Sequence, residues 1–103
     1  MRALPDDPDT LDLLPVFCLD WLHILDCRIW PAVLEARDCA ALHRLGHTAN
    51  GSFSQFGLAD GAMLGNDLIA CSRVDDWDGA IRTVAAMRLV VAQLLEQLGQ
   101  AAS

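Results

Sequence analysis

The sequence predicts an all-α protein, an antiparallel four-helix bundle with up-down-up-down topology. Apolar residues recur at helical spacing along most of the chain, and no segment shows the sustained alternation of a strand. Aspartates and glycines stand where helices would begin and end, so four helices follow one another with short connections. At 103 residues the chain can bury a single core, so we expect one domain.

The expected organisation is a flexible N-terminal tail over residues 1–9, the bundle over residues 10–99 and a short C-terminal tail over residues 100–103. The first helix should run from about Thr10 or Pro15 to Ala36. Because Pro31 cannot donate a backbone hydrogen bond, we predict a kink or break near it. The apolar face of this helix comprises Leu14, Phe17, Trp21, Ile24 and Leu25.

The second helix is expected to begin after Asp38, a good N-cap, and to end near Gly57. The third should cover about Ala59–Arg73. Its apolar side would hold Met63, Leu64, Leu68 and Ile69. Gly61 and Gly65 weaken this helix intrinsically, but glycines four apart could let a neighbouring helix come close.

The fourth helix should start within "DDWDGA", where Asp75 or Asp76 would cap it, and should run to about Gly99. A near-heptad seam would face the core: Trp77, Ile81, Val84, Val91, Leu95 and Leu98.

Composition excludes several classes of partner and compartment. The chain carries 14 acids against 7 bases, a net charge of −7, and every base is arginine. This balance argues against binding to nucleic acid or to anionic membranes. No apolar run reaches the length of a membrane span, and the N-terminus lacks the apolar core of a secretory signal, so we expect a cytoplasmic protein. The four cysteines form no CxxC pair, and we expect them to be reduced core thiols.

The helix around His47 has two contrasting faces. At about 100° per residue, the apolar stripe is centred opposite His47, so the imidazole should face solvent in mid-helix. The stripe comprises Leu42, Leu45, Ala49, Phe53 and Phe56. The positions beside His47 are Ala40, His43, Arg44, Asn50, Gly51 and Ser54.

Gly51 lies one turn after His47. A mid-helix glycine costs up to about 1 kcal/mol relative to alanine, so its use here would be clearance for something that approaches the imidazole. An exposed, rigidly mounted imidazole with room around it suits phosphoryl transfer through a histidine nitrogen.

The string "GHTANGSFSQFG" resembles the motif of histidine-containing phosphotransfer (HPt) domains, relay modules of two-component signalling. His47 matches the phosphoacceptor, Gly51 and Ser52 match the Gly-Ser that follows it, and Phe56 with Gly57 matches the end of that helix. The resemblance extends over about residues 11–98. It departs at two positions, because Asn50 stands where the family usually has lysine and Ala49 where it usually has leucine.

The resemblance implies a phosphocarrier that is not an enzyme and has no cofactor of its own. The partner, a response-regulator receiver domain or a hybrid histidine kinase, would supply the aspartate and the Mg²⁺. His47 would accept the phosphoryl group, and Asn50, Gly51 and Arg44 would shape the site. Ala40, His43 and Ser54 would contact the partner.

Two alternatives stay open. The first is a degenerate HPt-like adapter that binds a receiver or kinase without accepting phosphate. The second is a metal-binding helical bundle, because Cys39, His43 and His47 are spaced four apart, as are His23 and Cys27.

Overall fold

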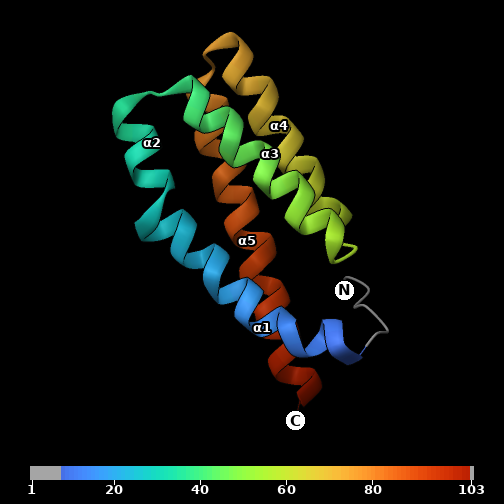
Figure 1. The fold of residues 1–103 in the computed structure, drawn as a ribbon. Helices are drawn as coiled ribbons and strands as arrows, with labels where there is room; N and C mark the ends of the chain where they lie inside the picture. Colours follow the sequence, from blue (N-terminus) through green and yellow to red (C-terminus); the bar gives the residue numbers. More distant parts are fainter. Residues whose placement is uncertain (1–7, 103) are drawn as a thin grey trace.

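The computed structural model describes residues 8–102, and every regular element within that range is helical. Four long helices pack into a bundle, in which α4 lies beside both α3 and the longest helix, α5, and α1 also packs along α5 (Figure 1). The elements are α1 (Pro8–His23), the π-helix η1 (Ile24–Arg28), α2 (Trp30–Ala36), α3 (Cys39–Gln55), α4 (Ala59–Val74) and α5 (Trp77–Ala102). Residues 1–7 of the expected N-terminal tail lie outside the described residues.

The first expected helix is broken near Pro31, as predicted. The α-helix passes at Ile24 into a π-helical turn, in which the Ile29 amide donates to the Ile24 carbonyl at 3.0 Å. Pro31 then lies in the first turn of α2, where a missing N–H leaves no hydrogen bond unmade. Arg88 of α5 forms a bidentate ion pair with Asp26 at 2.8 and 3.0 Å, which fastens η1 to the bundle.

Side chains at the helix ends explain where α3 and α5 begin. The Asp38 carboxylate accepts the Ala41 amide at 3.1 Å and caps α3. Asp76, rather than Asp75, caps α5 by accepting the Gly79 amide at 2.9 Å. Gly57 follows α3 with a φ of 71°, a conformation that glycine adopts without strain. The connections on either side of α4 are therefore only two or three residues long.

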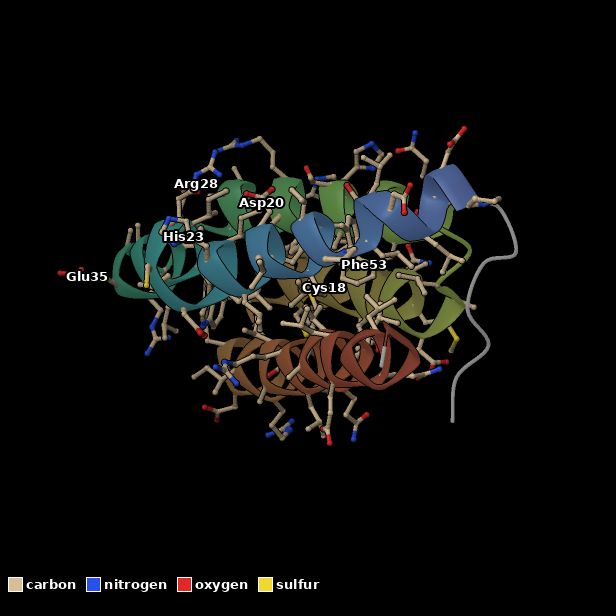
Figure 2. The ribbon with its side chains drawn as sticks, turned by 90° about the horizontal axis from the view of Figure 1, so that it is seen from below. Cys18, Asp20, His23, Arg28, Glu35 and Phe53 are labelled. Carbon is tan, nitrogen blue, oxygen red and sulfur yellow. The ribbon has the colours of Figure 1, made fainter. Side chains whose placement is uncertain are left out.

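Aromatic side chains join α1 to α3 in the core. Phe17 lies edge-on to Phe53 with ring centroids 5.1 Å apart, and Trp21 lies 5.2 Å from the same ring. Phe53 is fully buried, and Figure 2 shows it directed into the interior together with Cys18. The predicted core face of the first helix is therefore confirmed, with Phe17 only partly buried.

Two residues predicted to be in the core are exposed. Met63 of α4 is 65% exposed and Ile81 of α5 is 41% exposed. Helix α4 instead buries its small residues, because these allow α3 to approach closely, and α5 turns a slightly different stripe inward. The buried residues are Gly61, Ala62, Gly65, Leu68 and Cys71 on α4, and Gly79, Ala80, Val84, Met87, Val91 and Leu94 on α5.

The close approach of α3 and α4 rests on glycine, as the spacing of Gly61 and Gly65 predicted. A Cβ atom on Gly65 would lie 2.5 Å from the Asn50 backbone nitrogen and 2.7 Å from the Gly46 carbonyl oxygen. A Cβ on Gly46 would lie 2.6 Å from the Gly65 oxygen, and one on Gly61 would collide with the Phe53 ring. Any larger residue would push the two helices apart.

The four cysteines are free thiols in different environments. Cys18 and Cys71 are buried, and burial raises the pKa of the Cys18 thiol to about 11. Cys39 is partly buried, whereas Cys27 on η1 is exposed. The expectation of core thiols is therefore confirmed for two of them and wrong for Cys27, since the π-helical turn directs it outward.

Candidate functional site

His47 lies in the middle of α3, with its imidazole exposed. On the opposite side of the helix the predicted stripe faces the core, with Phe56 at its end only partly buried. The buried members are Leu42, Leu45, Ala49 and Phe53. Because these side chains anchor one whole side of α3, the imidazole is carried on a fixed helix rather than on a loop.

The exposed side of α3, here called the His47 face, comprises Ala40, His43, Arg44, His47, Gly51 and Ser54. All six residues are exposed, so the structure brings together five of the predicted site residues around His47. Asn50 is the exception, because it is partly buried at the edge of this face. Its side-chain NH₂ donates to the Ala62 carbonyl of α4 at 3.0 Å, so this amide serves the α3–α4 contact rather than lining the exposed face.

Gly51 differs from the other glycines of this helix pair. Among the described residues, no atom lies within 4 Å of the position that a Cβ atom on Gly51 would occupy. Its φ is not in the left-handed region, so neither packing against these residues nor backbone conformation requires glycine here. The open space next to His47 is therefore available to a molecule from outside.

The His47 face is free of acidic side chains. Helix α3 contains no Asp or Glu, although the protein carries a net charge of −7 and the other long helices each carry acids. The side chains on this face that can bear positive charge are those of His43, Arg44 and His47. Within residues 8–102 the Arg44 guanidinium forms no ion pair, so it is free to meet an anion.

A pocket of about 190 Å³ lies between α3 and the bent first helical segment, meaning the end of α1, η1 and Ile29. It adjoins the His47 face at Arg44. The residues around it are Trp21, Ile24, Ile29, Ala41, Arg44, Leu45 and Thr48. The sequence pattern did not reveal this pocket, because it depends on the distance between α3 and the π-helical turn.

The Cys39, His43 and His47 series does not gather a metal site in the described part of the chain. There, no three His, Cys, Asp or Glu side chains are placed to hold an ion together. The Cys39 thiol instead donates to Asp75 Oδ1 at 3.2 Å, and this hydrogen bond raises the pKa of the thiol. A raised pKa makes the thiolate, the form that binds metals, harder to reach.

The same carboxylate oxygen of Asp75 accepts the Trp77 indole N–H at 2.6 Å, and the Arg37 guanidinium lies over the Trp77 ring. These contacts tie the connection before α3 to the connection before α5, at one end of the bundle. The contacts among Arg37, Cys39, Asp75 and Trp77 therefore serve to hold these two connections together, and this role explains the four residues without a ligand.

Two wider findings accompany this geometry. None of the helices described here is both long enough and apolar enough to cross a membrane. Comparison of the chain with known proteins found no matching family model, no similar curated protein and no similar solved structure.

Proposed function

We propose that the protein is a histidine phosphotransfer module of two-component signalling, in which His47 carries a phosphoryl group between receiver-domain aspartates. The observation that carries this proposal is the pairing of an exposed mid-helix imidazole with a glycine one turn away that no internal contact requires. We place the module in the cytoplasm, where such receivers act.

The chemistry needs little from this chain beyond the imidazole. The Nε2 lone pair of His47 would attack the phosphorus of an aspartyl phosphate on the receiver. As the new N–P bond forms, the bond from phosphorus to the aspartate oxygen breaks, and its electron pair stays on the carboxylate. The receiver contributes the aspartate and a bound Mg²⁺, which neutralises charge on the phosphoryl oxygens. Transfer onward to a second receiver reverses these steps.

A rigid mount supports this role. Group transfer requires the reacting atoms to meet in a defined geometry, and an error of about 1 Å can cost on the order of a hundredfold in rate. Helix α3 is held by its buried stripe, by the Asp38 cap and by the Asn50 hydrogen bond to α4.

The proposal also includes an antiparallel HPt-like bundle, a topology that the short connections around α4 favour.

Charge on α3 supports the choice of partner. A receiver active site is a cluster of carboxylates that hold Mg²⁺ and an aspartyl phosphate, so its approach would be opposed by acidic side chains. Helix α3 carries none, in a protein that is otherwise strongly acidic. This local balance favours docking of an acidic partner surface at the His47 face.

Arg44 is the charged residue that we assign to the phosphoryl group. The family usually supplies a lysine at the position of Asn50, but here that side chain is used in the contact with α4. Arg44 lies one turn before His47 on the same face and forms no ion pair within the described residues. A guanidinium is well suited to bind phosphoryl oxygens because it donates two parallel hydrogen bonds.

Incubation with a phosphorylated receiver or a hybrid histidine kinase tests the proposal. The wild-type protein should acquire an acid-labile phosphate, and a His47→Gln variant should acquire none. His43→Gln is the matched control, since it removes a neighbouring exposed imidazole and should still label. Labelling of the His47→Gln variant would overturn the assignment.

One observation favours the adapter as a second candidate, namely that Asn50 brings no charge to the His47 face. Size-exclusion chromatography with the receiver separates the two functions. An unlabelled wild-type protein that co-elutes with a receiver would establish the adapter, whereas labelling excludes it.

A further inference from the structure

We propose that the pocket between α3 and the bent first helical segment binds a small carboxylic acid with an apolar body, such as an arylacetate or a short-chain acid. The proposal goes beyond phosphotransfer, because the ligand would bind the free protein whether or not His47 accepts a phosphoryl group.

The inner wall of the pocket is apolar. Trp21, Ile24 and Leu45 line it and are almost fully buried by the rest of the protein. Ala41 is partly buried and adds only a methyl group, so its small size leaves space there. Hydrocarbon placed against these side chains would leave water, and burial of apolar surface favours binding.

The volume of the pocket limits the size of the ligand. An apolar cavity of about 150 Å³ is known to hold benzene, so a pocket of about 190 Å³ suits one aromatic ring or a short acyl chain with a small polar head. A larger ligand would extend into solvent over the rim.

The residues at the rim of the pocket favour a ligand with a negative charge. Arg44 and Thr48 border the pocket, and neither side chain has a partner within the described residues. The described residues that line the pocket include no acid. The acids of the segment that forms the other wall are already paired, Asp20 with Arg28 at 3.6 Å and Asp26 with Arg88 at 2.8 Å. A carboxylate beside Arg44 therefore finds a free cation and a free hydroxyl.

Calorimetric titration with phenylacetate tests the proposal, with phenylacetamide as the uncharged probe of the same shape. Phenylacetate should bind with a Kd of about 1 mM or lower, within the range open to a ligand of this size. Phenylacetamide and the Arg44→Gln variant should each show binding about tenfold weaker, the loss expected when a charged hydrogen bond is removed. Arg73→Gln, the same substitution on an exposed arginine of α4 that does not line the pocket, should leave the Kd unchanged.

A filled pocket supplies the second test. In Ala41→Leu the larger side chain should occupy the space and abolish binding of phenylacetate, and circular dichroism would establish that the variant is folded. If this variant unfolds, NMR spectroscopy of the Arg44→Gln variant takes its place. Phenylacetate should shift the amide signals of α3 and η1 in the wild-type protein, and these shifts should be lost in Arg44→Gln.

Three outcomes would overturn the proposal: no heat or amide shifts with millimolar phenylacetate, equal affinity for phenylacetamide, or unchanged binding in a folded Ala41→Leu protein. Receiver binding that is lost in Ala41→Leu, without any binding of phenylacetate, would assign the pocket to a protein partner instead.

Discussion

The two sides of α3 use glycine for opposite reasons. On the side facing α4, Gly46 meets Gly65 so closely that a Cβ atom on either would lie within 2.7 Å of the other helix's backbone. On the exposed side, Gly51 has no neighbour within 4 Å of its Cβ position. The first contact is explained by the fold alone. The second glycine weakens the helix, and no contact among the described residues requires it. The proposed function explains it as clearance for a partner that approaches His47.

The largest effect is expected where the helices touch. In Gly65→Ala, the new Cβ would collide with the Asn50 nitrogen and force α3 and α4 apart. We expect the free energy of unfolding to fall by roughly 1–3 kcal/mol, the range for overpacking a core. Urea denaturation followed by circular dichroism measures this change. Unaltered stability would mean that the interface is looser than the structure shows.

Substitution of Gly51 should have opposite effects on the stability of the protein and on its rate of phosphoryl transfer. In Gly51→Gln, replacement of a mid-helix glycine should raise the free energy of unfolding by up to about 1 kcal/mol. The same side chain would obstruct the partner, so labelling by a phosphorylated receiver should slow by about tenfold or more. Ala70→Gln, at an exposed position of α4, is the control that should label normally. A Gly51→Gln protein that labels at the wild-type rate would remove the clearance argument.

Asn50 lies at the boundary between the two sides, and its replacement tests which side it serves. Asn50→Ala removes the hydrogen bond to the Ala62 carbonyl, so stability should fall by about 0.5–1.5 kcal/mol. Ser54→Ala, on the exposed face, should change stability by less than about 0.5 kcal/mol. Asn50→Lys should lose the same stability as Asn50→Ala. Thermal denaturation of the three variants would reveal whether the amide holds α4, and equal melting temperatures for all would argue that it does not.

The smallest effect is expected at an exposed contact outside the bundle core. The hydrogen bond from Arg88 lowers the pKa of Asp26 below its ordinary value of 3.8. The pair therefore makes its full contribution to stability above the ordinary pKa, which the carboxyl has in the unfolded state. The contribution is lost as the pH falls from that value through the lower pKa of the folded state. In Arg88→Gln this part of the acid dependence should vanish, and added salt should diminish the difference between wild type and variant. Denaturation curves of the wild type and of Arg88→Gln at pH 7 and near pH 3 measure this acid dependence. If both proteins lose the same stability between the two pH values, the ion pair does not contribute to it.

Helix α3 was predictable in detail because its two sides differ sharply in polarity. Asp38 marks its start, large apolar residues define one side, and His43, Arg44 and His47 define the other. Exposure of His47 follows from this contrast, which needs only the helical period. The resemblance to HPt domains adds the role of the imidazole, and that role stays a prediction.

Helices α4 and α5 were less predictable, for a physical reason. The chain is 53% hydrophobic, so these helices carry more apolar residues than one core can cover. A pattern of large side chains favoured Met63 and Ile81 for the core, but both are exposed. Helix α4 approaches α3 through glycine and alanine. The spacing of Gly61 and Gly65 indicated a close approach, but a pattern of large apolar side chains does not show that this small-residue side of α4 is the buried one.

The sequence alone determined the helical class, the break near Pro31, the cap at Asp38 and the outward direction of His47, since each depends on residues a few positions apart. Tertiary structure decided the rest. It directed Asn50 to α4, matched Gly46 with Gly65, and opened the pocket between the π-helical turn and α3. These features depend on how far apart two helices lie, and that distance results from packing the whole chain rather than from any one segment.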